Sequence, residues 1–188
     1  MRSVTRAALG ACTALVLSLI FFAPRAGAVS GISHAQAVVQ INWQVLPGAA
    51  RDIGIGGDQV WVIGTNRVPG GYGIYHWNGS GWEGMPGGAV AIDVDSNGFP
   101  WVINSAHNIF RWNGSSWDGL PGLARDIGIG ADDSVWVIGT NRVPGGYGIY
   151  QWNGSGWDYA PGGAVRIDVD SNGNPWVVNS AHNIYQGS

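Results

Sequence analysis

The chain has 188 residues, among them 32 glycines, 11 tryptophans and no lysine. Glycine is far above its usual share of about 7%. So much glycine excludes a mainly helical fold, and so many aromatic residues exclude a disordered chain, which has no core to hold them. The formal net charge is −3, and an acidic chain is a poor partner for nucleic acid or for an anionic membrane.

The N-terminal segment 1–28 has the layout of a secretory signal peptide. Arg2 and Arg6 precede an apolar run that ends before Pro24, and residues 26–28 supply small side chains for cleavage. The run is shorter than the ~20 residues of a membrane-spanning helix, so we expect a secreted protein, extracellular or periplasmic, without membrane insertion. Cleavage after Ala28 removes the only cysteine and three arginines, which leaves six arginines against twelve acids and a formal net charge of −6.

After a short segment at residues 29–39, the rest of the chain is repetitive. The sequence from Val60 to Tyr75 recurs unchanged from Val135 to Tyr150. Each long repeat divides into a longer and a shorter unit, and the four units begin at equivalent aspartates, namely Asp52, Asp93, Asp126 and Asp168. Each unit reads as four short strands separated by turns rich in Gly and Asn, which is typical of a propeller blade.

We therefore predict an all-β fold, a β-propeller of four four-stranded blades within residues 40–188. The blades cover residues 47–84, 86–119, 121–159 and 161–188. The last blade lacks an outer tryptophan strand, whereas Trp43 precedes the first blade in the register of the outer tryptophans of the other blades, Trp82, Trp117 and Trp157. We expect residues 40–45 to pair with Asn183–Gln186 and to close the ring. The alternative is an open arc that closes by oligomerisation.

Several recurring motifs extend over residues 43–185. They are a Trp-x-x-x-Pro-Gly start at Trp82, an Asp-Ile strand at Asp126, a Val-Trp strand at Val135, and an Ile-Tyr-x-Trp-x-Gly-x-x-Trp end over residues 149–157. This set resembles the tectonin repeats of tachylectin-like and fish-egg-type lectins. The resemblance implies a propeller that binds carbohydrate, often on microbial surfaces. The blade number differs, since tectonin propellers usually have six blades.

The connections between second and third strands carry the candidate carbohydrate-binding residues. These connections are long in the odd blades, at 65–72 and 140–147, and short in the even blades, at 104–108 and 179–183. Loops over a rigid scaffold often bind ligands; Arg and Asn donate hydrogen bonds to hydroxyls, and Tyr offers a stacking face. The candidates are Asn66, Arg67, Tyr72, His107, Asn108, Asn141, Arg142, Tyr147, His182 and Asn183. Alternatively, Arg67 and Arg142 pair with acids such as Asp58 or Asp132 and only pin the loop.

The repeated acids and tryptophans have structural explanations. A tryptophan at a fixed strand position favours packing between blades. An aspartate at the same point of every unit favours a hydrogen bond to a neighbouring turn, because a glycosidase needs one special pair of carboxylates. We therefore expect no catalytic residue and no cofactor.

Two Asp-x-Asp-x-Asn-Gly stretches copy the start of a calcium loop but lack the glutamate at its twelfth position. They make Asp93, Asp95, Asn97, Asp168, Asp170 and Asn172 candidate calcium ligands beside the simpler interpretation as hairpin turns. The sequence as a whole predicts a secreted lectin whose repeated loop sites lie on one propeller face. The alternative is a non-catalytic protein-binding scaffold.

Overall fold

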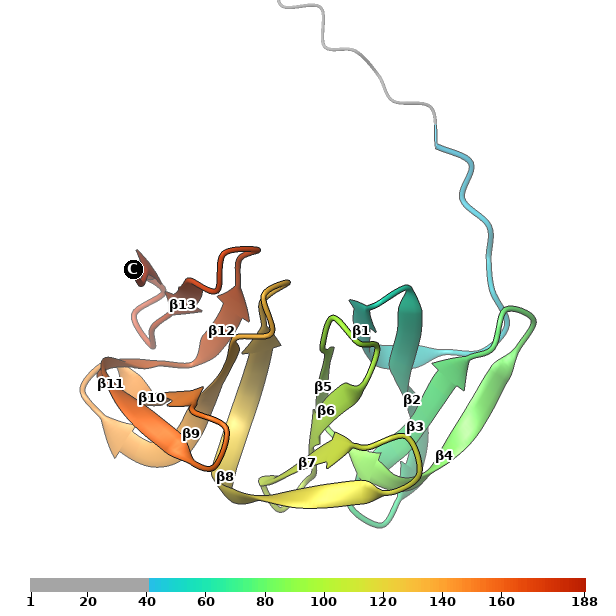
Figure 1. The fold of residues 1–188 in the computed structure, drawn as a ribbon, viewed down its shortest axis with the longest axis horizontal. Coiled ribbons are helices and arrows are strands. Elements are labelled where there is room, and N and C mark those ends of the chain that lie inside the picture. The colour runs from blue at the N-terminus through green and yellow to red at the C-terminus, as the bar shows by residue number, and fades with distance from the viewer. Residues whose placement is uncertain (1–40) are drawn as a thin grey trace, which may run out of the picture. The chain divides into compact units, whose positions relative to one another are not determined.

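The computed structural model describes residues 41–188, and all regular structure in that range is β-strand (Figure 1). The expected all-β fold is confirmed. The predicted signal peptide and the segment at 29–39 lie outside the described residues. No helix suited by length and apolar character to crossing a membrane occurs within residues 41–188. The strands are β1 (Ala50–Gly56), β2 (Gln59–Val68), β3 (Gly71–Trp77), β4 (Trp82–Ala89), β5 (Ala91–Val94), β6 (Pro100–Ile103), β7 (Asn108–Trp112), β8 (Trp117–Ile129), β9 (Val135–Val143), β10 (Gly146–Trp152), β11 (Trp157–Ala164), β12 (Arg166–Val169), β13 (Pro175–Val178) and β14 (Ile184–Gln186).

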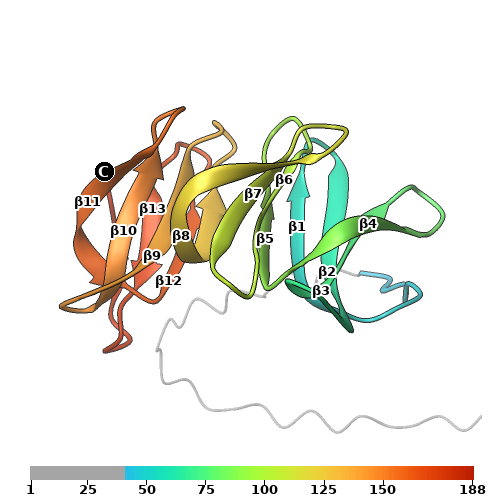
Figure 2. The ribbon, with the colours of Figure 1, turned by 90° about the horizontal axis from the view of Figure 1, so that it is seen from below.

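All strand pairs are antiparallel and join neighbours in the sequence. The sheets have the orders β1-β2-β3-β4, β11-β10-β9-β8-β7-β6-β5 and β12-β13-β14. In the seven-stranded sheet, residues 117–123 of β8 pair with β7 and residues 124–129 pair with β9. We therefore number four units in chain order. Unit 1 is β1–β4, unit 2 is β5 to residue 123, unit 3 is residue 124 to β11, and unit 4 is β12–β14. Figure 2 shows these units following one another from β4 at one end to β11 and β13 at the other.

The hydrophobic core lies between the units rather than within them. In the cluster between units 1 and 2, Trp61 and Ile74 of unit 1 pack with Ile92 and Val102 of unit 2. A second cluster joins units 2 and 3, and a third joins units 3 and 4. Each unit thus buries a face only against its neighbour, as in repeat proteins generally.

Three aspartates link the innermost strands of successive units. Asp52 Oδ2 accepts a hydrogen bond from the backbone N–H of Ile92 at 3.1 Å. Asp93 Oδ2 accepts one from Ile129 at 2.6 Å in the same way. The corresponding bond from unit 4 to Asp126 Oδ2 is 3.0 Å long. These bridging aspartates are structural, as the sequence indicates, but their partner is the next inner strand rather than a turn.

The innermost strands approach each other closely at glycines. A Cβ atom added to Gly128 of β8 would lie 3.0 Å from the Cα atom of Asp168, and one added to Gly54 of β1 would lie 3.2 Å from that of Asp93. Contacts this short leave no room for a side chain. The glycines in the Asp-Ile-Gly-Ile stretches therefore let the bridging aspartates reach the next strand.

Outer-strand tryptophans make a second repeated link. The indole N–H of Trp82 donates to the Pro47 carbonyl at 2.8 Å, and that of Trp117 in unit 2 donates to the Pro86 carbonyl on β4 of unit 1 at 2.8 Å. The Trp157 indole of unit 3 and the Pro121 carbonyl of unit 2 form the third such bond, at 2.7 Å. Trp117 and Trp157 thus bind the Pro-Gly segment through which the chain leaves the preceding unit.

The long connections of the odd units are not loops. β2 and β3 continue as a hairpin in which Arg67 pairs with Tyr72 and Val68 with Gly71, beyond a bulge that follows Ile63. β9 and β10 do the same around residues 142–147. Only Pro69 and Gly70 remain as the turn, and Gly70 has a φ of +90°. Pro followed by a residue of positive φ matches a type II turn, which is why the strands extend where the sequence predicts a loop.

The expected closing strand is not found among the described residues. Residues 41–46 form no strand, Trp43 is 86% exposed, and β14 pairs only with β13. The hydrogen bond from Trp82 to the Pro47 carbonyl instead ties the segment before β1 to unit 1. The predicted pairing of residues 40–45 with Asn183–Gln186 within one chain is therefore not confirmed and stays a prediction.

Burial, assisted by the nearby carboxylates of Asp168 and Asp52, raises the pKa of Asp93 to about 6. The backbone N–H groups of Val94 and Ile129 oppose this rise by stabilising the charged form. Burial also raises the pKa values of Asp52 and Asp126. The folded protein therefore holds these protons more tightly than the unfolded chain does.

We predict that the free energy of unfolding falls by about 1–3 kcal/mol as the pH rises from about 4, near the pKa of an unfolded aspartate, to about 6, the folded pKa of Asp93. The fall occurs because the folded state binds more protons in this range. Urea denaturation at pH 4, 5, 6 and 7.5 measures it. Asp93→Asn should remove most of the slope. A stability that rises across this range contradicts the assignment.

Candidate functional site

Two arginines and one tyrosine gather at the hairpin end of unit 1. The Cζ atom of Arg51 lies 4.2 Å from the centroid of the Tyr72 ring, and that of Arg67 lies 5.3 Å from it. Arg67 reaches the ring because it pairs with Tyr72 across the hairpin. Arg51 comes from β1, at a shift in register between Ala50 and Asp52, and such bulges re-aim side chains.

Unit 3 repeats this arrangement. Arg125 lies 4.2 Å from the Tyr147 ring centroid, and Arg142 lies 5.2 Å from it. We call the two sets the arginine–tyrosine clusters. Arg67, Tyr72, Arg142 and Tyr147 are among the residues predicted from the sequence, whereas Arg51 and Arg125 on the inner strands are not. The sequence does hold a signal for these arginines, since an Ala-Arg-Asp triplet opens both odd units. The spacing of residues does not reveal the bulge that turns this arginine toward the tyrosine.

The cluster arginines have no acidic partner in the described part of the chain. The ion pair found there joins Arg111 Nη2 to Asp95 Oδ2 at 2.8 Å. The alternative in which Arg67 and Arg142 pair with Asp58 or Asp132 is therefore wrong. Each cluster places two positive charges around one aromatic ring. Guanidinium groups so placed gain from a carboxylate or phosphate, to which they bind bidentately.

Asn66 and Asn141 serve the hairpins rather than the clusters. The Tyr75 hydroxyl donates to Asn66 Oδ1 at 3.0 Å, and the Tyr150 hydroxyl donates to Asn141 Oδ1 at 2.9 Å. A Cβ atom added to Gly73 would lie within 3.0 Å of both the oxygen and the nitrogen of the Asn66 amide. These amides thus fill the bulge beside the glycines.

The predicted residues of the even units lie in tight turns. His107 and His182 have positive φ values of 69° and 65°, and His107 Nδ1 lies 3.1 Å from the Ala124 carbonyl oxygen. The backbone N–H groups of Asn108 and Asn183 donate to the side chains of Asn104 and Asn179.

These turns sit beside the hairpins of the odd units. Ser105 N–H donates to the Gly70 carbonyl at 2.8 Å, and Ala124 N–H donates to the His107 carbonyl at 2.9 Å. The turn of unit 2 therefore joins the hairpin tip of unit 1 to the segment that carries Arg125. The structure thus brings the candidate residues of neighbouring units to one edge.

The candidate calcium residues act as caps of their own turns. Asp95 Oδ1 accepts the N–H groups of Asn97 and Phe99, and its other oxygen pairs with Arg111. Asp170 accepts the backbone N–H groups of Asn172 and Asn174. The hydrogen bond from Asn174 is the main reason why the pKa of Asp170 is lowered. Asp93 and Asp168 each accept the N–H of the following residue. Within residues 41–188, no three His, Cys, Asp or Glu side chains are arranged to hold a metal ion.

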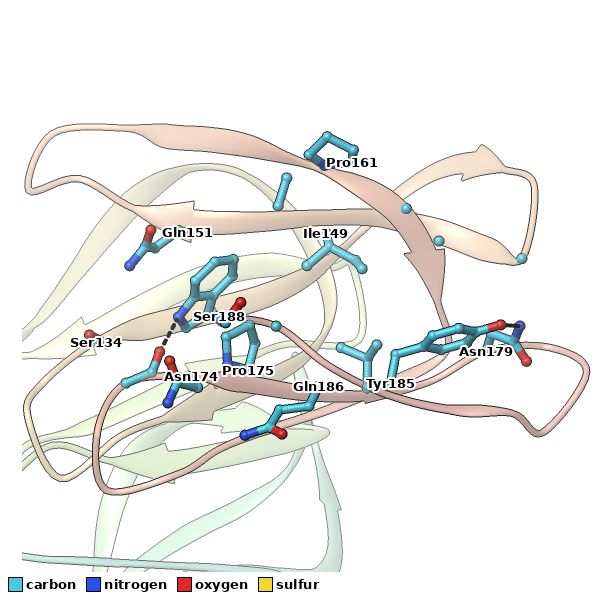
Figure 3. Close-up of a pocket in the computed structure, with 18 of the residues that line it drawn as sticks. Ser134, Ile149, Gln151, Pro161, Asn174, Pro175, Asn179, Tyr185, Gln186 and Ser188 are labelled. Atoms are coloured by element: carbon cyan, nitrogen blue, oxygen red, sulfur yellow. Dashed lines mark hydrogen bonds between the residues drawn. The ribbon is translucent and has the colours of Figure 1, made fainter.

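A cavity lies elsewhere, between units 3 and 4. It has a volume of about 810 Å³ and is lined by residues that include Ile149, Pro161, Asn179 and Tyr185 (Figure 3). Figure 3 shows β11 with Pro161 on one side and β13–β14 with Pro175 and Tyr185 on the other. None of the residues predicted from the sequence to bind carbohydrate lines this cavity.

The fold and the two clusters define a class of protein: a repeat protein of antiparallel sheets that presents paired cationic–aromatic sites at one edge. The family model described as the Tectonin domain matches residues 88–188, just over half of the chain. The chain therefore belongs to the tectonin family, which confirms the resemblance of its motifs.

Two proteins of Physarum polycephalum are similar over part of the chain. Tectonin-2 is 40% identical over 55 residues, which cover 29% of this chain and 14% of that protein. Tectonin-1 is 31% identical over 68 residues, which cover 36% of this chain and 30% of that protein. The chain thus matches less than a third of either relative's length. A solved structure titled "YCF48 bound to D1 peptide" covers 78% of this chain and 52% of that chain, at 16% identity and a TM-score of 0.48.

We predict that Asn141→Ala lowers the free energy of unfolding by about 1 kcal/mol, the usual cost of one lost hydrogen bond, because the Tyr150 hydroxyl loses its acceptor. The neighbouring Arg142→Ala is the matched control. It should cost less, because an exposed cation–π contact contributes about 0.5–1 kcal/mol. Chemical denaturation of both variants tests the assignment, and equal stability of Asn141→Ala and the unmodified protein would refute it.

Proposed function

We propose that the protein is a secreted, non-catalytic lectin of propeller type, in which the four units are blades. The observation that carries the proposal is the pair of arginine–tyrosine clusters. Arg51 and Arg67 share one ring without an acidic partner in the described residues, and Arg125 and Arg142 repeat this. Membership of the tectonin family, which includes lectins, supports carbohydrate as the ligand.

The geometry favours acidic glycans over neutral ones. A neutral sugar stacks on an open aromatic face, but Arg51 lies 4.2 Å from the Tyr72 ring centroid and so covers part of it. The guanidinium groups instead offer donors to carboxylate or phosphate groups on a glycan, such as a microbial surface polysaccharide. In a secreted chain of formal net charge −6 after removal of residues 1–28, these local positive sites attract such groups against the overall negative charge.

Two equivalent sites on one body give avidity. On a dense surface the second contact is effectively intramolecular, so that weak single sites combine into an apparent affinity about 10²–10⁴ times higher. The protein therefore needs only modest affinity at each cluster. The even units lack the long hairpin, so the proposed sites number two rather than four.

A glycan array that contains neutral, uronate-bearing and phosphate-bearing glycans tests this function. We predict binding to the acidic set, and binding that weakens as salt is raised, because exposed charges are screened. Arg67→Ala together with Arg142→Ala should lower binding about tenfold or more, whereas Glu83→Gln, which changes an exposed charge of β4 outside the clusters, should leave it unchanged. Absence of binding to every glycan, or unchanged binding by the double variant, contradicts the proposal. The first outcome would favour the protein-binding scaffold.

A further inference from the structure

The cavity between units 3 and 4 has a filled counterpart in the preceding long repeat. Between units 1 and 2, a pocket of about 170 Å³ is lined by Ile74, Val102 and Phe110, the equivalents of Ile149, Val177 and Tyr185 in the large cavity. The smaller pocket is also lined by Trp117. The larger cavity, of about 810 Å³, has no tryptophan at that place.

The missing tryptophan belongs to an outer strand. Trp117 lies on the part of β8 that pairs with β7. β14 is the equivalent of β7 in unit 4, and no strand of the described chain pairs with its free edge. The cavity is therefore the seat of an outer strand that carries a tryptophan.

Trp43 has the sequence setting of such a tryptophan. It stands four residues before Pro47, as Trp117 stands four residues before Pro121 and Trp157 before Pro161. It is 86% exposed. Pro47 has the same role in unit 1 as the equivalent prolines have elsewhere, since its carbonyl accepts the Trp82 indole N–H.

Unit 4 exposes the face that unit 2 buries. Trp101 and Ile109 of unit 2 are 4% and 1% exposed against unit 3, whereas their equivalents Trp176 and Ile184 are 42% and 70% exposed. Unit 1 exposes the matching face. Its Ile53 and Ile55 are 58% and 62% exposed.

The equivalents of these isoleucines in unit 3 are covered by unit 2. Ile127 is 6% exposed and Ile129 is 9% exposed. The exposed face of unit 4 is thus equivalent to the face that unit 2 packs against unit 3, and the exposed face of unit 1 is equivalent to the face of unit 3 in that contact.

The exposed faces of units 4 and 1 carry the equivalents of polar groups that form hydrogen bonds between units 2 and 3. Asp93 Oδ2 accepts the Ile129 N–H, but its equivalent Asp168 accepts only the N–H of Val169 among the described residues. Ser96 donates through its N–H and its hydroxyl to Asp133, at 2.8 Å each. The equivalents of that pair are Ser171 in unit 4 and Asp58 in unit 1.

We propose that a second copy of this chain supplies the missing strand. Residues 41–46 of the second copy pair with β14, its Trp43 fills the cavity, and its β1 packs on β12, where Asp168 accepts the N–H of Ile55. Within the described residues, the three inter-unit cores leave the outer faces of units 1 and 4 without a neighbouring unit. Two such contacts related by a twofold axis close a dimer, the commonest closed symmetry. The ring then has eight units, within the range of known propellers.

Unit 4 differs from unit 2 on this face where Arg166 replaces Ala91 and Val178 replaces Ile103. Ala91 is buried between units 2 and 3, whereas Arg166 is exposed. Within the single chain its positive charge already opposes the rise in the pKa values of Asp52 and Asp126.

A designed disulfide tests the partner and the register together. Phe110 pairs with Gly119, two residues after Trp117, so Tyr185 should face Val45 of the second copy. We would combine Val45→Cys and Tyr185→Cys with Cys12→Ser and oxidise the purified protein. We expect a disulfide-linked dimer on a non-reducing gel. The matched control, Val45→Cys with Gln186→Cys, places the cysteines on opposite faces of their strands and should give far less of it.

The outcomes separate the possible occupants of the cavity. A monomer with an internal disulfide would mean that the chain's own segment closes the ring, and it would overturn the proposal. Absence of any disulfide would also overturn it.

Sedimentation analysis of the unmodified protein is the second measurement, and it needs no variant to fold. We expect a concentration-dependent dimer, with Trp43→Ala raising the dissociation constant about tenfold or more, as for buried aromatic anchors at interfaces. Tyr159→Ala, which removes an exposed ring of β11 outside the contact, should leave the constant unchanged. A monomer at every concentration would refute self-association. None of these results depends on glycan binding.

Discussion

The structure depends on the contact between one inner strand and the next. No unit has a core of its own; Trp61 and Ile74 are buried because unit 2 lies against them, and Ile129 is buried because unit 2 covers it from the other side. The bridging aspartates add a directional bond to this packing at each junction. Burial of a carboxylate costs free energy because the charge loses its hydration, and the raised pKa of Asp93 reflects that cost. The carboxylates remain because each satisfies an inner-strand N–H that would otherwise be unpaired.

The same repeats that build the core also position the candidate site. The hairpin of an odd unit is long enough to bring Arg67 beside Tyr72, and the bulge at the start of β1 turns Arg51 to the same ring. The turns of even units are too short for this and instead brace the hairpins, as the bond from Ser105 to Gly70 shows. The odd units need long hairpins for the arginine–tyrosine clusters and the even units need only short turns, which explains why the unit lengths alternate.

Most of the architecture is readable from the sequence because it is periodic. The strands, the structural role of the aspartates and the packing role of the tryptophans follow from residues that recur at fixed places. Two features are not readable. The Pro69-Gly70 turn makes a hairpin of a segment that looks like a loop, because a type II turn needs only two central residues. The position of Trp43 depends on tertiary structure, because its register predicts an outer strand on unit 4 but not whether that unit belongs to the same chain or to a second copy.

One measurement bears most directly on the repeated inter-unit contact, namely hydrogen exchange at the backbone amide of Ile55. Its equivalent, Ile129, donates to a bridging aspartate and serves as an internal reference for protection. If the open ends are matched halves, the Ile55 amide should be protected nearly as well as that of Ile129 in concentrated solution and should lose this protection on dilution. Rapid exchange at Ile55 at every concentration, with Ile129 protected, would contradict the account.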